Sequence, residues 1–106
     1  ELARAIRHLA ETAAPYGTYN VTGSGTVCSW ADVARRTFAL AGHDPDRVSG
    51  VSTAAYFAKA TAPIAPRPMF GALDLTKIES TGFVPADADE TLAKYVRSEA
   101  RETQRA

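Results

Sequence analysis

The sequence predicts a small α/β fold with a few short strands and three to four helices. Apolar residues recur at helical spacing in several stretches of the chain, and short segments rich in β-branched and aromatic residues lie between those stretches. The 106 residues suffice for one small domain, but they are too few for a complete nucleotide-binding sheet beside a separate second domain.

The N-terminal segment predicts a helix followed by a strand. Residues 2–13 favour an amphipathic helix because Leu2, Ile6 and Leu9 share one side of it and charged residues occupy the other. Proline then ends the helix. Residues 16–21 combine aromatic and β-branched side chains, which is typical of a strand.

A second helix is predicted after a Gly-Ser-Gly turn at residues 23–25. Ser29 is a good N-terminal cap, since its hydroxyl can accept a bond from an unpaired backbone N–H of the first turn. Asp32 follows three residues later, near the positive end of the helix dipole. Gly42 is the expected stop.

The middle of the chain predicts short elements separated by loops. A polar linker at residues 43–46 precedes a strand candidate at residues 47–52 and one or two helical turns at residues 53–60. Residues 62–68 contain three prolines, which fix φ and lack an N–H, so this stretch is expected to be an extended loop. Residues 72–75 predict another short strand.

The C-terminal part predicts two helices. Thr76 is expected to cap a brief helix that continues to Glu79 and is broken by Gly82. A last helix begins at a cap supplied by Asp87 or Asp89. Residues 97–106 are mostly charged and are expected to fray.

Composition excludes several classes of function. Lysine plus arginine equals aspartate plus glutamate at 12 each, so no basic excess indicates nucleic acid. Cys28 is the sole cysteine of the sequence, which excludes an internal disulfide framework and a cysteine-based zinc site. No apolar run approaches the ~18 residues of a membrane helix, and no signal-peptide pattern is present. Because Glu1 already lies in a helical pattern, we expect the chain to be a piece of a longer protein.

Several residue types that often carry chemistry favour a structural role here. Gly23 and Gly25 lie between a strand and a helix, as in a dinucleotide-binding loop, but the third glycine of that motif is missing, so we expect an ordinary tight turn. Cys28 has no histidine nearby to activate its thiol. His8 and His43 lack metal-ligand spacing and are expected to be solvated.

Arg67 is the strongest candidate for ligand binding. Because Pro66 and Pro68 flank it, its backbone is stiff, and its planar fork of N–H donors suits a diphosphate or a carboxylate. The alternative is a surface salt bridge, for example to Asp74.

Two aromatic residues are further candidates. Trp30 follows the helix cap directly and could line a ligand pocket, or it could cover the core. Tyr56 precedes Lys59 by three positions rather than the four of a Tyr-x-x-x-Lys proton relay, and no tyrosine of the chain has lysine at the fourth position. We therefore expect no catalytic tyrosine in this chain.

Taken together, these segments resemble the C-terminal part of the dTDP-4-dehydrorhamnose reductases, a family of extended short-chain dehydrogenases/reductases. The resemblance covers residues 2–96. It rests on the order and spacing of Gly17-Thr-Tyr-Asn-Val21, Gly23, Ser29-Trp30, Thr53-Ala-Ala-Tyr56, Arg67-Pro68, Leu73-Asp74, Lys77, Gly82-Phe83 and Leu92.

The resemblance implies a function for the chain and a place for its chemistry. Enzymes of this family bind NAD(P)H in an N-terminal Rossmann domain and reduce a 4-keto sugar nucleotide to dTDP-L-rhamnose in the cytoplasm. Residues 1–96 would then be a fragment of the substrate-binding domain and residues 97–106 a charged tail. The cofactor loop and the catalytic pair would belong to the missing Rossmann domain, leaving no catalytic, cofactor or metal site here. The implied contacts to the dTDP-sugar are Arg67, Pro68, Tyr56 and Trp30.

Other readings stay open at this point. The same architecture serves sugar-nucleotide epimerases and dehydratases, and a Pro-Arg-Pro loop could also bind a partner protein as a polyproline segment. Without a partner domain, apolar side chains are expected to be exposed and to drive self-association of the fragment. The candidates for that surface are Tyr56, Phe57, Ile64, Met69 and Phe70.

Overall fold

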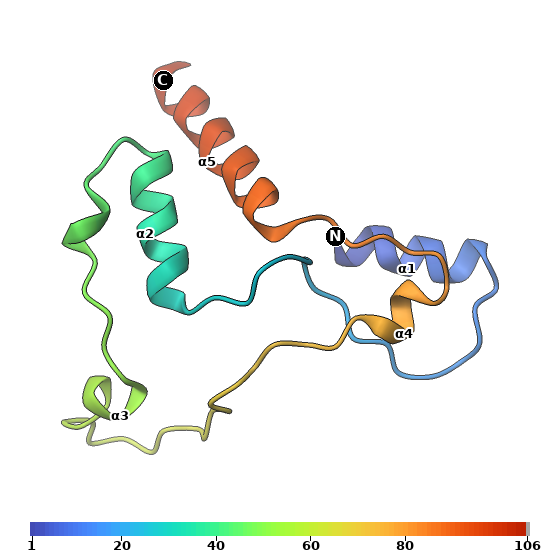
Figure 1. Cartoon of the computed structure of the whole chain (residues 1–106), viewed down its shortest axis with the longest axis horizontal. Helices are drawn as coiled ribbons and strands as arrows, with labels where there is room; N and C mark the ends of the chain where they lie inside the picture. The colour runs from blue at the N-terminus through green and yellow to red at the C-terminus, as the bar shows by residue number, and fades with distance from the viewer. Residues whose placement is uncertain (106) are drawn as a thin grey trace. The chain divides into compact units, whose positions relative to one another are not determined.

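A computed structural model describes residues 1–105 and shows helices joined by extended segments (Figure 1). The α-helices within these residues are α1 (Leu2–Glu11), α2 (Trp30–Leu40), α3 (Thr53–Tyr56), α4 (Thr76–Glu79) and α5 (Ala88–Arg105), and one 3-10 turn, η1, covers Pro45–Arg47. Two compact units are present. Unit 1 comprises Glu1–Thr26 with Ala72–Leu92, and unit 2 comprises Val27–Gly71 with residues 93–105.

The predicted strands are absent from the described part of the chain. Residues 16–21, 47–52 and 72–75 form no ladder, and the single β-type pairing in residues 1–105 is an isolated parallel bridge between Ser24 and Asp87. The α/β prediction was therefore wrong about the strands, and five α-helices replace the three to four expected. Short extended segments need neighbouring strands to form a stable sheet, and these segments have none.

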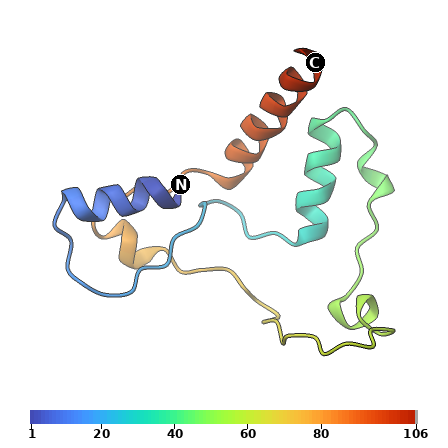
Figure 2. The same ribbon diagram turned by 180° about the vertical axis from the view of Figure 1, so that it is seen from behind.

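Unit 1 is held by a small core between α1 and α4, which lie side by side in both views (Figure 2). The hydrophobic cluster has three buried members: Ala5 on α1, Ile78 on α4 and Phe83 in the segment that follows. Partly buried side chains surround them, namely Leu9, Tyr19, Val21 and Leu75. Residues 19 and 21 thus bury apolar side chains as a strand would, although their backbone is unpaired.

The face of α1 that meets this core differs in part from the predicted one, since Leu9 packs against the core as expected but Leu2 and Ile6 do not. Ala5 is fully buried, whereas Leu2 and Ile6 are 62% and 60% exposed. His8, expected to be solvated, is half-buried, with its Nε2 3.0 Å from the carbonyl oxygen of Thr81. Its ring lies 5.5 Å from that of Phe83. The prediction for His8 was wrong because the carbonyl oxygen of Thr81 pairs with the imidazole, whose ring packs at a tilt of 57° against that of Phe83.

Helix α2 confirms the predicted start and stop. The backbone N–H of Asp32 donates to Ser29 Oγ at 3.2 Å, and the backbone N–H of Ser29 donates to the Asp32 carboxylate at 2.9 Å, which together form a capping box. The backbone N–H of Ser29, followed by the Ser29 hydroxyl, which donates to the same carboxylate at 2.7 Å, lowers the pKa of Asp32. At the other end, Gly42 has a φ of +80° and allows His43 N–H to reach the carbonyl of Phe38 at 2.8 Å.

The starts of the C-terminal helices refine the prediction. Thr76 is the first residue of α4 rather than its cap. Of the two candidates for the cap of α5, Asp87 fills the position, since its Oδ1 accepts from the backbone N–H of Glu90 at 3.0 Å. Residues 97–105, expected to fray, continue α5 to Arg105. Arginine, glutamate, alanine and glutamine dominate this stretch, and all four favour helix.

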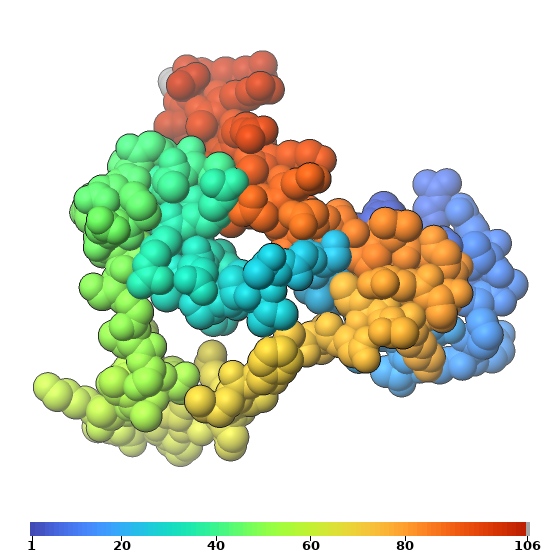
Figure 3. Space-filling view, viewed as in Figure 1, coloured from blue at the N-terminus to red at the C-terminus, as the bar shows by residue number. Residues whose placement is uncertain are grey.

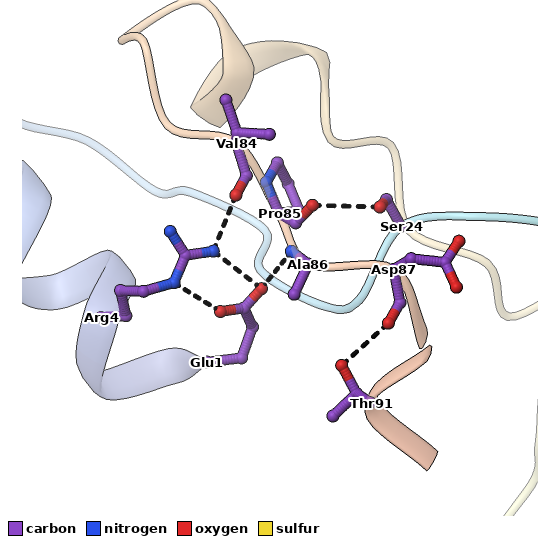
Figure 4. Close-up of polar contacts among 8 residues, drawn as sticks. All are labelled: Glu1, Arg4, Ser24, Val84, Pro85, Ala86, Asp87 and Thr91. Atoms are coloured by element: carbon purple, nitrogen blue, oxygen red, sulfur yellow. Dashed lines mark hydrogen bonds and ion pairs between the residues drawn. The ribbon is translucent and has the colours of Figure 1, made fainter. Parts of the chain in front are cut away.

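A polar network joins the start of α1 to residues 84–86 (Figure 4). Glu1 pairs with Arg4 at 2.8 Å and also accepts the backbone N–H of Ala86. Arg4 donates in turn to the carbonyl of Val84 at 2.7 Å, and its guanidinium lies 4.4 Å from the centre of the Phe83 ring. The bond from Arg4, followed by that from Ala86, lowers the pKa of Glu1 from 4.5 to about 2.

We expect this network to make the stability of unit 1 depend on pH. Because folding lowers the pKa of Glu1, its contribution is present above the ordinary value of 4.5 and is lost as pH falls towards about 2. The melting temperature of the native chain should therefore exceed that of Glu1→Gln at neutral pH, and the difference should vanish at about pH 2. Thermal unfolding followed by circular dichroism across this range measures it.

Glu11→Gln is the matched control, because Glu11 pairs with Arg7 at 2.7 Å on an exposed face of α1 and bridges to no other segment. Its effect on the melting temperature should be the smaller of the two. Equal effects of both substitutions at every pH would contradict a special role for Glu1.

Candidate functional site

The candidate site lies in unit 2, where α3 leads into the proline-rich loop. Helix α3 is short but well capped: the backbone N–H of Ala55 donates to Ser52 Oγ at 3.1 Å, and that of Tyr56 donates to the Ser52 carbonyl at 2.9 Å. At its end, Phe57 N–H donates to the carbonyl of Thr53 at 3.1 Å. This turn fixes the backbone of two consecutive aromatic residues.

The structure places two predicted site residues, Tyr56 and Arg67, next to the ring of Phe57. The Arg67 guanidinium carbon lies 5.7 Å from the centre of the Phe57 ring. The ring of Tyr56 meets Phe57 edge to face, with centres 4.9 Å apart and planes at 87°. Phe57 therefore contacts both residues, although the sequence predicts it to be among the exposed apolar side chains and not in the site. The sequence signal for such a contact is a pair of aromatic residues at the end of a capped turn, followed by a short loop that carries an arginine.

Arg67 keeps its hydrogen-bond donors available. Within residues 1–105 its guanidinium forms no ion pair or hydrogen bond. The alternative partner, Asp74, is engaged elsewhere, because its Oδ1 accepts the backbone N–H of Thr76 at 2.9 Å. The side-chain and backbone bonds from Thr76 lower the pKa of Asp74. The salt bridge weighed as an alternative role for Arg67 is thus not formed.

Trp30 stands apart from this aromatic cluster. It is the first residue of α2, and its side chain is 87% exposed, so it does not cover a core as the alternative prediction held. Across the described residues its indole makes no ring or polar contact with Tyr56 or Arg67. The structure leaves Trp30 as a free aromatic surface in unit 2.

Comparison with known protein families matches residues 1–101 to the RmlD substrate binding domain. The chain belongs to this family. The match confirms the resemblance found in the sequence and extends it five residues beyond the predicted limit, into α5. It identifies the chain as a substrate-binding part related to sugar-nucleotide reductases. No curated protein and no solved structure matches the chain significantly.

The glycine pair of this RmlD substrate binding domain packs closely against the start of α5. Gly25 has a φ of +111°, and a Cβ there would lie 2.7 Å from the Asp87 carboxylate. A Cβ on Gly23 would lie 3.0 Å from that of Ala88. Between them, Ser24 exchanges backbone bonds with residues 86 and 88 at 2.9 Å. The glycines therefore allow close packing against the start of α5.

Other features of the described residues add no competing site. Shallow depressions in unit 1, the larger about 470 Å³ and bordered by Glu79 and Phe83, contain none of the predicted site residues. Cys28 is exposed and unpaired. Within residues 1–105 no three histidine, cysteine or acidic side chains gather closely enough to hold a metal. None of the helices there combines the length and apolar character needed to cross a bilayer.

Proposed function

We propose that this chain is the substrate-binding part of an NAD(P)H-dependent dTDP-4-dehydrorhamnose reductase, which acts in the cytoplasm to make dTDP-L-rhamnose. The family match over residues 1–101 supports the reductase assignment. The observation that carries the binding role is Arg67, a guanidinium without a carboxylate partner, held between two prolines and against Phe57.

In this proposal Arg67 binds the diphosphate of the dTDP-sugar. A guanidinium presents parallel N–H donors that match two phosphate oxygens, and such charge-assisted bonds are the strong ones. Pro68 and Pro66 restrict the backbone on both sides, which reduces the freedom lost on binding. The exposed rings of Tyr56 and Trp30 offer flat apolar surfaces to the base or the sugar.

The contribution of this chain to the reaction is orientation. Holding a substrate in reactive geometry can supply several kcal/mol of a rate enhancement, on the order of 7–11 at its upper limit. NAD(P)H, when bound by the remainder of the enzyme, supplies the hydride. The glycine pair at residues 23–25 is packed against α5, and no Tyr-x-x-x-Lys pair is present, so the cofactor and the general acid are assigned to the Rossmann domain.

We expect Arg67→Ala to weaken dTDP binding by about 10- to 100-fold, since bonds to a charged group contribute roughly 1.5–3 kcal/mol. The dTDP affinity of Arg67→Lys should lie between those of the native chain and Arg67→Ala, because an ammonium keeps the charge but not the paired donors. Isothermal titration of dTDP into this chain and into the full-length reductase measures both.

Arg47→Ala provides the matched control for this measurement. Arg47 also belongs to unit 2 and also lies over a phenylalanine, at 6.0 Å from the Phe38 ring. Its loss should leave dTDP affinity unchanged. Equal affinities for the native chain and Arg67→Ala would overturn the proposed binding role.

The isolated chain should be catalytically silent, because it holds neither the cofactor loop nor the proton-donating tyrosine. Incubation with NADPH and dTDP-4-dehydrorhamnose should therefore produce no decrease in NADPH absorbance. The full-length reductase, assayed in parallel, is the positive control. Turnover by the 106-residue chain alone would show that a complete active site lies within it.

We also propose that the isolated chain self-associates through apolar side chains of unit 2. Tyr56, Met69 and Phe70 are 73%, 101% and 71% exposed, and such a surface favours a second copy in the absence of another partner. Light scattering after size exclusion should show a molar mass that rises with concentration. The double substitution of Met69 and Phe70 by serine should reduce that rise, whereas a monomer at high concentration would contradict the proposal.

A further inference from the structure

The loop that carries Arg67 lacks the usual means of holding a loop in place. Residues 61–73 form no hydrogen bond or ion pair within the described chain. Figure 3 shows the stretch as a narrow string of residues, and residues 61–71 are all exposed. The loop is instead connected to α3 by a cation–π contact between Arg67 and the ring of Phe57, ten positions earlier in the chain.

The ring of Phe57 is anchored where the loop is not. Its backbone N–H donates to Thr53, and its carbonyl accepts from Ala60 at 3.0 Å, so the turn fixes the residue on both sides. The side chain is half-buried, and Tyr56 packs edge-on against it. A fixed aromatic face therefore lies beneath a cation on a loop that is otherwise unattached.

We propose that Phe57 is a positioning residue that holds the Arg67 guanidinium ready for the diphosphate, an inference that rests on the proposed function. A cation is attracted to the face of an aromatic ring within about 6 Å, and this contact consumes none of the five N–H donors. The donors stay available for phosphate oxygens. The arrangement reduces the conformational freedom that Arg67 loses when a ligand binds.

The positioning role predicts how substitutions at Phe57 and Arg67 combine. Because Phe57 acts through Arg67, its effect on ligand affinity should exist only when Arg67 is present. A residue that merely stabilises the fold of unit 2 would change affinity in either background. This difference separates positioning from a structural role.

The test is a double-mutant cycle with dTDP as the ligand, measured by isothermal titration. Phe57→Leu keeps an apolar side chain but removes the aromatic face, and we expect about 2- to 5-fold weaker binding. Phe57→Tyr keeps the face and should bind as the native chain does. In the Arg67→Ala background, Phe57→Leu should cause no further loss.

A spectroscopic measurement without ligand supports the cycle. The Arg67 Nε–Hε resonance should carry a ring-current shift in the native chain and in Phe57→Tyr, and lose it in Phe57→Leu. Phe38→Leu is the control, because the same change at the ring beneath Arg47 should move the Arg47 resonance alone. It should leave dTDP affinity unchanged.

The outcomes separate this inference from the function on which it rests. If Arg67→Ala binds dTDP as tightly as the native chain, the proposed function fails. If Arg67→Ala weakens binding while Phe57→Leu leaves it unaltered, only the positioning role is overturned. Equal losses for Phe57→Leu and Phe57→Tyr, or an added loss in the Arg67→Ala background, would also overturn it.

Discussion

Burial of Phe83 is the interaction on which unit 1 depends. Its ring packs with Ala5 and Ile78 in the core. The guanidinium of Arg4 and the ring of His8, both on α1, also pack against it. These contacts come from α1 and α4, so one side chain holds together both helices and the segment that leads into α5. Without a sheet, no ladder of backbone bonds shares this task.

The helices could be predicted because the information that specifies them is local. Ser29, Gly42 and Asp87 act on residues within one turn, and the structure confirms all three. Strands depend on partners elsewhere in the chain, and residues 16–21 have an alternating composition without any partner. The orientation of α1 was missed for a similar reason: Leu2 and Ile6 form a convincing apolar face, but the core of unit 1 meets Ala5 instead.

The candidate site likewise combines residues that the sequence predicts with one whose role depends on a contact far along the chain. Arg67 was found from its two flanking prolines, and Tyr56 from a resemblance in sequence. The role of Phe57 depends on a contact that spans the whole loop, which no local pattern contains. The choice of an aromatic partner over an acidic one has a chemical consequence. A carboxylate beside Arg67 would compete with a phosphate for the same donors, whereas a ring holds the cation and adds no negative charge.

The close approach between Gly25 and Asp87 ties a turn near one end of the chain to a helix at the other. Any side chain at position 25 would need a backbone conformation that L-residues avoid, and it would also collide with the carboxylate. That carboxylate caps α5. A substitution at Gly25 would consequently disturb the cap of a helix that begins some sixty residues further along the chain.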